Sequence, residues 1–301
     1  MQYIAVIDCG TNTFTMSLFE VKEDQSFRRL LKDRHYVELA EESIKYIGKA
    51  PFQRGLAAFK GFEEVLKDYP DCMVYPIGTA ALRRAANSKE FLAAVDQQSQ
   101  MTIDIIDGDR EAALIHQGVR LAAPLDEEPS LIMDIGGGSV EFILCSKDEV
   151  FWAKSFPVGV AVLFQAFHKS DPIQKEELDA IKSYLDKELK VLLEQLEKYP
   201  PKHLIGASGS FDVLDKLVGA KLKGELYGKL TPDQFWAIHE ELTKASYEER
   251  LNTKNIMPTR AKLIVMSMAL ISFTLKHIDI PELIVSDYAL REGLVWELLQ
   301  K

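Results

Sequence analysis

The chain has 301 residues, a formal net charge of −10, 47% hydrophobic residues and 27% charged residues. This length allows two domains with separate cores, and the composition is ordinary for a globular protein. An acidic chain lacks the basic face that a nucleic-acid-binding surface needs. A local basic site or a divalent cation can still hold a phosphate substrate on such a chain.

The cysteines, Cys9, Cys72 and Cys145, form no C-x-x-C pair, which favours reduced thiols in a cytoplasmic protein. No basic leader precedes the first strand, so we expect no signal peptide. The longest apolar run, residues 263–275, is shorter than the ~20 residues of a membrane-spanning helix. We interpret it as a buried core helix, and we expect neither a membrane nor a nucleic acid as a partner.

The first part of the chain predicts alternating strands and helices. In order, these are three strands over 3–39, an amphipathic helix around 56–66, a strand at 73–77, helices starting at 79 and 88, a strand at 103–106 and a helix over 109–121. The third strand, around 28–39, is long and charged, as an edge strand should be. Residues 122–129 contain two prolines and three acidic residues and are the best linker candidate.

The second part of the chain repeats this order. We expect strands at 131–133, 140–145, 150–155 and 203–205, a long helix over 175–198, a loop over 217–230, the buried helix, a strand at 283–285 and a helix over 288–299. The repetition predicts an α/β protein with mixed sheets flanked by helices. We place the domains at 1–124 and 125–301, and a C-terminal helix of about 288–301 can pack back on the first domain.

An acidic, glycine-bearing turn occurs twice, each time between two β-like runs. The first copy is Asp8-Cys9-Gly10-Thr11-Asn12-Thr13, and the second is Asp134-Ile135-Gly136-Gly137-Gly138-Ser139, with Glu141 just beyond. Successive N–H groups of such turns bind anions, and the aspartate can hold a cation. An ordinary hairpin bend also explains the first copy, but three consecutive glycines are costly to order. Two such turns facing each other across a cleft would grip a metal-bound phosphate from both sides.

Two further segments lead from a strand into a helix and carry candidate groups. Residues 78–87 form a small-residue helix start, which is an anion site, and Arg83 can reach the same place. Residues 107–112 contain Glu111, a candidate for catalysis. Capping and the helix dipole explain these acidic residues equally well, so both interpretations stay open.

Two more candidates come later in the chain. Residues 206–210, with Ser208 and Gly209, either contact a phosphate or form a tight turn between a strand and a helix. Arg260 begins the apolar helix and extends either outward or into the cleft. The histidines are scattered without ligand spacing, so we expect no zinc site.

Together these motifs resemble the exopolyphosphatase and guanosine pentaphosphate phosphatase (Ppx/GppA) family of the actin-like ATPase-domain superfamily. The resemblance extends over essentially the whole chain, and the segment from Asp134 to Glu141 is its most specific part. The other matching segments are 8–13, 79–87, 107–112, 155–159, 206–210, 260–261 and 286–293. The resemblance implies two actin-like (ribonuclease H-like) domains, each with a mixed five-stranded sheet, around an interdomain cleft.

The resemblance also implies roles for single residues. Glu111 takes the position of the catalytic base, and Arg110 stands where the family pattern has a glutamate. Asp134 and Glu141 take the positions linked to Mg²⁺ (or Mn²⁺), and we expect Asp8 to help hold the same ion. We expect the following residues to bind phosphoryl oxygens: Gly10, Thr11, Asn12, Thr13, Arg83, Gly136, Gly137, Gly138, Ser139, Ser208, Gly209 and Arg260.

The expected function is an exopolyphosphatase that hydrolyses the terminal phosphoanhydride bond of inorganic polyphosphate with a Glu-activated water and Mg²⁺. Thr15 lies near the place where many family members carry an arginine that helps hold a guanosine polyphosphate, and the chain ends where longer members continue. We therefore expect short polyphosphate as the substrate. The alternatives are guanosine pentaphosphate hydrolysis, an actin-like sugar or acetate kinase, and a non-catalytic polyphosphate sensor. A homodimer is left open.

Overall fold

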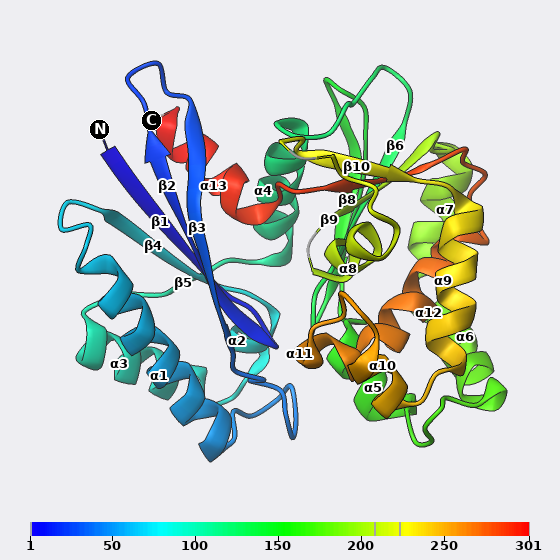
Figure 1. Cartoon of the computed structure of the whole chain (residues 1–301), viewed down its shortest axis with the longest axis horizontal. Coiled ribbons are helices and arrows are strands. Elements are labelled where there is room, and N and C mark those ends of the chain that lie inside the picture. Colours follow the sequence, from blue (N-terminus) through cyan, green and yellow to red (C-terminus); the bar gives the residue numbers. More distant parts are fainter. Residues whose placement is uncertain (1, 208, 223, 301) are drawn as a thin grey trace. The chain divides into compact units, whose positions relative to one another are not determined.

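The computed structural model describes residues 2–207, 209–222 and 224–300. The chain divides into two compact units, Met1–Leu114 with Arg291–Lys301, and Ile115–Leu290. Figure 1 shows that each unit is built from a sheet and surrounding helices. The division falls inside one helix, ahead of the expected boundary at 124, and the end of the chain belongs to the first unit.

The first unit contains a mixed sheet of five strands in the order β3-β2-β1-β4-β5. The strands are β1 (Gln2–Cys9), β2 (Thr13–Val21), β3 (Phe27–Tyr36), β4 (Met73–Gly78) and β5 (Asp104–Ile105). The first three are antiparallel, and β4 and β5 run parallel to β1. A turn at Gly10–Asn12 therefore joins two central neighbours of the sheet.

The helices of the first unit lie on both sides of its sheet. They are α1 (Lys49–Leu66), α2 (Ala80–Arg84), α3 (Ser88–Ser99), the start of α4 (Gly108–Arg120) and most of α13 (Leu290–Leu299). One sheet face packs on α1 and α3, where alternate residues of β1 and β2, such as Ile7 and Met16, join Phe59 and Phe91 in the core. The alternation of period two directs the intervening residues, among them Asp8, to the opposite face.

The second unit contains a mixed sheet of six strands in the order β10-β11-β9-β6-β7-β8. The strands are β6 (Ser130–Ile135), β7 (Val140–Cys145), β8 (Val150–Phe156), β9 (His203–Ala207), β10 (Tyr227–Leu230) and β11 (Leu283–Ser286). Strands β6, β7 and β8 are antiparallel, whereas β9 and β11 run parallel to β6. The arrangement repeats that of the first unit, with one strand added at the edge.

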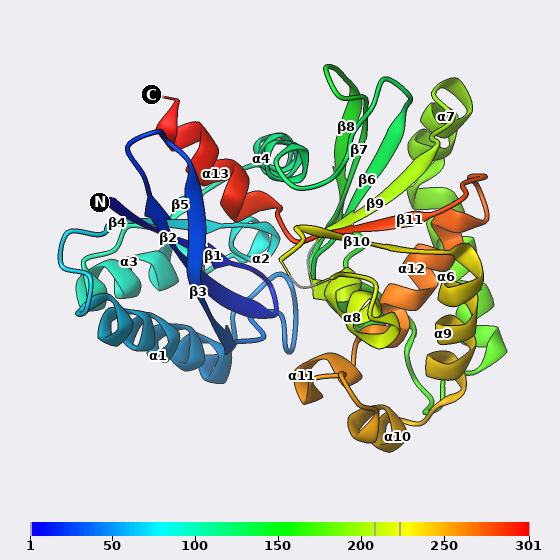
Figure 2. The same ribbon diagram turned by 45° about the horizontal axis from the view of Figure 1, so that its top comes forward.

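The helices between β8 and β11 pack on one face of the second sheet, where Met133 and Phe142 join them in a single core, and the turned view in Figure 2 shows this layer. They are α5 (Val160–Phe167), α6 (Lys175–Glu188), α7 (Lys190–Lys198), α8 (Gly209–Val218), α9 (Pro232–Lys244), α10 (Tyr247–Asn252), α11 (Pro258–Ala261) and α12 (Ile264–Leu275). Every residue of α12 is buried, and this helix packs against α5, α6 and α9. The prediction of a buried core helix is confirmed. In the described part of the chain, no helix is long and apolar enough to span a bilayer.

Two expectations about the second unit are wrong. Residues 227–230, predicted as loop, form strand β10, whose Tyr227 and Leu230 pair with Ser286 and Leu283 of β11. The second sheet therefore has six strands rather than five. The long helix predicted over 175–198 is broken at Leu189, whose backbone leaves the helical region at φ −99° and ψ 14°. Leu189 is fully buried, so the apolar stripe continues through the break and conceals it in the sequence.

Candidate active site

The first glycine turn is held in place by the segment that follows β3. Within the turn, the N–H of Gly10 donates to the carbonyl of Thr13 at 3.1 Å. The N–H groups of Val37 and Glu38 both donate to the carbonyl of Asn12 at 2.9 Å, and the N–H of Leu39 donates to that of Thr11 at 2.7 Å. The turn is thus a fixed feature of the folded unit, with two of its carbonyls bound by the segment after β3.

Asp8, at the end of β1, is paired with a guanidinium. Nη1 of Arg291, in the first turn of α13, lies 3.1 Å from Oδ2 of Asp8. Burial raises the pKa of Asp8 above its ordinary value and outweighs the opposing effect of Arg291, Lys32 and Arg34. A cation at Asp8 would have to compete with this guanidinium, so the assignment of Asp8 to a metal stays a prediction.

Arg83 and Glu111 form an ion pair in the first unit. Nη1 of Arg83 donates to Oε2 of Glu111 at 2.6 Å and to the carbonyl of Ile106 at 2.8 Å. Arg83 lies in the last turn of the short helix α2, and Glu111 lies in the first turn of α4, where it is only 8% exposed. The two segments that the sequence singled out separately therefore meet, and the contact fixes the direction of the Glu111 carboxylate.

The neighbour of Glu111 also has a defined partner. Nη2 of Arg110 donates to Oε1 of Glu297 in α13 at 2.6 Å, and Nη1 donates to the other carboxylate oxygen. Asp107 caps the same helix start by accepting from the N–H of Arg110 at 2.7 Å. Capping thus accounts for Asp107, whereas Glu111 turns toward Arg83.

In the second unit, Asp134 and Glu141 occupy directly opposite positions on β6 and β7. Opposite residues of an antiparallel pair project to the same face of the sheet, so the two carboxylates are neighbours. Oε1 of Glu141 accepts from the hydroxyls of Ser139 at 2.7 Å and Ser155 at 2.6 Å. Both acidic residues are buried, at 8% and 1% exposure. Their geometry is therefore preset by the strands and the serines.

The glycine-rich turn between these strands is braced by the start of α5. The N–H of Gly136 donates to the carbonyl of Ser139 at 2.9 Å, and the N–H groups of Val160 and Ala161 donate to the carbonyls of Gly136 and Gly137 at 3.0 and 2.9 Å. A Cβ on Gly159 would lie 2.4 Å from the Gly137 carbonyl oxygen. The close approach explains why a glycine precedes α5, because any side chain there would displace the turn.

The pair Asp134 and Glu141 fits a magnesium ion that is completed by substrate. Mg²⁺ in phosphate-processing sites is bound through one or two carboxylates plus water and phosphate oxygens. Across the described residues, no three or more His, Cys, Asp or Glu side chains gather into a group that could hold a metal by itself. The donor set therefore suits an ion that arrives with a phosphate, and the metal itself remains a prediction.

Arg260 and Gly209 meet at the start of α8. A Cβ on Gly209 would lie 1.9 Å from Nη2 of Arg260, so the guanidinium rests directly on this glycine. Ser210 anchors the same helix start, because its hydroxyl lies 2.8 Å from that of Ser267 in α12. Ser208, also predicted to bind phosphate, lies outside the described residues. A guanidinium beside a helix N-terminus supplies the positive charge and the N–H groups that bind a phosphate group.

Residues 19–301 match the model of the Ppx/GppA phosphatase family. The chain belongs to this family. It is 28% identical over 297 residues to a putative exopolyphosphatase of Haemophilus influenzae, which covers 98% of this chain and 91% of that protein. It is 27% identical over 300 residues to a guanosine-5'-triphosphate,3'-diphosphate pyrophosphatase of Photobacterium profundum, but spans only 59% of that longer protein.

The solved structures agree with the fold of this family. A crystal structure of an exopolyphosphatase from Cytophaga hutchinsonii is 32% identical with a TM-score of 0.95, and the match covers 99% of this chain and 98% of that one. The Aquifex aeolicus member of the Ppx/GppA family is 25% identical with a TM-score of 0.80 over 99% of this chain and 98% of that one. The predictions of an actin-like α/β fold with two sheets and of a phosphatase-family enzyme are confirmed.

Some residues that shape the site were not predicted to act in it. Ser155 and Gly159 support the second turn, and Arg291 pairs with Asp8. All three lie within segments that carry the family resemblance, so a signal was present in their spacing. Glu297 gives no such signal, and only the fold reveals its contact with Arg110.

Proposed function

We propose that this chain is an exopolyphosphatase, which hydrolyses the terminal phosphoanhydride bond of short inorganic polyphosphate and releases orthophosphate. The observation that carries the proposal is the 2.6 Å contact between Arg83 and Glu111. It joins a cation suited to a phosphoryl oxygen and a carboxylate suited to deprotonating water, both in a chain of the Ppx/GppA phosphatase family.

The proposed chemical step is an in-line attack by water on the terminal phosphorus. Glu111 accepts a proton from the water as its oxygen forms the new P–O bond. The bridging P–O bond then breaks, and the shortened polyphosphate leaves with that oxygen and its electron pair. Reaction releases one orthophosphate for each water consumed, and the proton on Glu111 returns to solvent.

The remaining groups stabilise the negative charge of the phosphoryl oxygens during this step. The N–H groups of the turns at 11–13 and 137–139 and the guanidinium of Arg83 hold phosphoryl oxygens, while Arg260 and Gly209 hold a more distal phosphate. The N–H groups of Gly10 and Gly136 already donate to carbonyls within their own turns. Asp134 and Glu141 would hold Mg²⁺ or Mn²⁺. When bound, such an ion supplies the positive charge that offsets charge on the non-bridging oxygens.

Guanosine pentaphosphate is the second candidate substrate, and one observation favours it. Thr15 pairs with Asp8 on one side and Arg34 on the other, so all three project to one face of the sheet. Thr15 carries no charge, but the neighbouring Arg34 places a guanidinium on the same face of the sheet. In this second candidate, Arg34 contacts a further phosphate of the nucleotide. The name of the Photobacterium relative also fits this substrate.

A phosphate-release assay with three substrates would test the proposal. Tripolyphosphate, long-chain polyphosphate and guanosine pentaphosphate are compared in parallel, with Mg²⁺ and with a chelator. We expect metal-dependent release that is fastest with tripolyphosphate. Fastest release from the nucleotide would transfer the proposal to the second candidate, whereas binding without release from any substrate would favour a sensor. ATP-dependent phosphorylation of a sugar or acetate would instead identify a kinase.

A further inference from the structure

Arg250, in α10, is a charged side chain buried inside the second unit. Its side chain is only 1% exposed. Burying a guanidinium is costly unless its N–H groups are paired. Here Nη2 donates to Oδ1 of Asp171 at 3.0 Å, Nη1 to the carbonyl of Ala245 at 2.5 Å, and Nε to the carbonyl of Ala261 at 3.0 Å. One side chain thus joins the residue before α10, the end of α11 and the distant loop at Asp171.

The third of these contacts reaches the residue next to Arg260. Helix α11 has four residues, Pro258–Ala261, too few to be stable as an isolated helix. Its orientation must therefore come from contacts outside the helix. The bond from Arg250 to Ala261 is such a contact, and it lies at the end of α11 from which Arg260 extends to Gly209.

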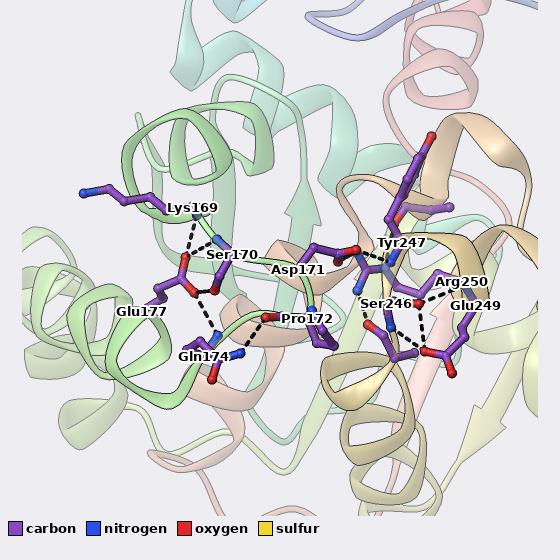
Figure 3. A network of polar contacts seen from close by, with 12 residues as sticks. Lys169, Ser170, Asp171, Pro172, Gln174, Glu177, Ser246, Tyr247, Glu249 and Arg250 are labelled. Carbon is purple, nitrogen blue, oxygen red and sulfur yellow. Dashed lines mark hydrogen bonds and ion pairs between the residues drawn. The ribbon is translucent and has the colours of Figure 1, made fainter.

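Asp171, the carboxylate partner of Arg250, is itself held by hydrogen bonds, as Figure 3 shows. Oδ2 of Asp171 accepts from the N–H of Tyr247 at 2.7 Å, and Glu177 accepts from the N–H groups of Ser170 at 3.1 Å and Gln174 at 2.8 Å. Partial burial raises the pKa of Glu177, but hydrogen bonds from the Ser170 hydroxyl and from the N–H groups of Gln174, Lys169 and Ser170 outweigh it and lower the pKa to about 2. The Glu177 carboxylate therefore stays charged at neutral pH. Its hydrogen bonds to Ser170 and Gln174 hold the loop on both sides of Asp171.

We propose that Arg250 is a positioning residue, which holds α11 so that the guanidinium of Arg260 stays at the start of α8 and binds a distal phosphate of the substrate. This inference rests on the proposed function of Arg260. Arg250 touches neither substrate nor reacting atoms in this proposal. Its effect on the reaction passes through Arg260 alone, which gives the inference a sharp consequence.

Double-mutant kinetics test that consequence. R250K keeps the charge but cannot reproduce three divergent N–H contacts, and R260A removes the phosphate ligand. We expect R250K to raise KM for tripolyphosphate roughly tenfold with kcat nearly unchanged, the size expected for losing one charge-assisted hydrogen bond. In the R260A background the same change should leave KM unaltered. Equal effects of R250K with and without Arg260 would overturn the proposal.

Two controls separate positioning from general damage. D171N removes the ion pair while leaving Arg250 in place, and should raise KM in the same way but less. K229Q breaks the pair of Lys229 with Glu282, which lies 2.7 Å away in the same unit and does not touch α11. It should leave KM unchanged. A kcat loss in R250K that exceeds the KM effect would contradict a role in binding.

Hydrogen exchange gives a readout that does not depend on activity. Amide exchange in residues 259–263 should be faster in R250K and D171N than in wild type, and unchanged in K229Q. If wild type releases no phosphate but α11 exchanges faster in R250K, the proposed function fails while Arg250 still holds α11. Unchanged exchange in α11 of R250K would overturn the positioning role whatever the activity.

Discussion

Arg110 and Glu297 join two helices of the first unit that are far apart in sequence. Nη2 of Arg110 lies 2.6 Å from Oε1 of Glu297, and the second nitrogen binds the other oxygen, so the pair is bidentate. Arg110 precedes Glu111, the proposed base, and Glu297 lies near the end of α13. Arg291, in the first turn of α13, reaches Asp8. One helix thus contacts both the first glycine turn and the helix that carries Glu111.

Charge reversal tests whether this pair matters. R110E and E297R each place like charges together and should reduce stability by about 1 kcal/mol, the range of a half-exposed ion pair. Each should also lower kcat, because the start of α4 carries Glu111. The double variant R110E/E297R restores opposite charges and should recover most of both losses. Urea unfolding and phosphate release measure the two effects. Additive losses in the double variant would mean that the residues act independently.

Replacing the proposed base should separate chemistry from binding. E111Q keeps the size and a hydrogen-bond acceptor but cannot take a proton, so we expect kcat to fall roughly a hundredfold or more with KM changed only slightly. D109N is the matched control, because Asp109 is an exposed acid in the same helical turn. It should turn over like wild type. Normal turnover by E111Q would remove Glu111 from the mechanism.

The sequence predicted the local parts of the site better than their contacts. The two glycine turns, Glu111 and Arg260 were singled out as candidates because glycines at strand ends and charges at helix starts are local patterns. The contact of Arg83 with Glu111 and of Arg291 with Asp8 depends on how distant segments pack, which no window of sequence contains. The same limit explains β10, a four-residue edge strand whose pairing with β11 is a tertiary contact.

The brace on the second glycine turn makes a steric prediction. G159A would place a methyl group 2.4 Å from the carbonyl oxygen of Gly137, so the turn or α5 must shift. Overpacking of this kind costs about 1–3 kcal/mol, and displacement of the turn should reduce phosphate release at least tenfold.

Gly48 offers a closely matched control. It also precedes a helix, with φ −66° and ψ 165° against −63° and 165° for Gly159. Its added Cβ would meet only the flexible end of Glu42, at 3.1 Å. G48A should therefore lower activity and melting temperature far less than G159A. Equal losses in the two variants would show that backbone freedom, rather than the contact with Gly137, explains the glycine.

His116 predicts how stability depends on pH. The side chain is buried in α4, and within the described chain its Nε2 atom has no hydrogen-bond partner. Burial, helped by the charge of Arg120, lowers the pKa of His116 to about 4. The unfolded chain binds a proton near pH 6.5, whereas the folded chain does so only near pH 4. Stability is therefore full above pH 6.5 and is lost as the pH falls through this window.

Between pH 7 and pH 4.5, protonation of His116 should lower the free energy of unfolding by about 2 kcal/mol. Urea unfolding of wild type and H116Q at both pH values measures it, since glutamine does not titrate. The wild-type decrease should exceed that of H116Q by this amount, because the other titrating groups are common to both proteins. H35Q is the control for removing a histidine elsewhere in the chain, because the side chain of His35 is partly exposed and lies 3.2 Å from Asp33. Equal pH dependence in wild type and H116Q would mean that His116 is protonated in the folded chain as readily as in the unfolded one.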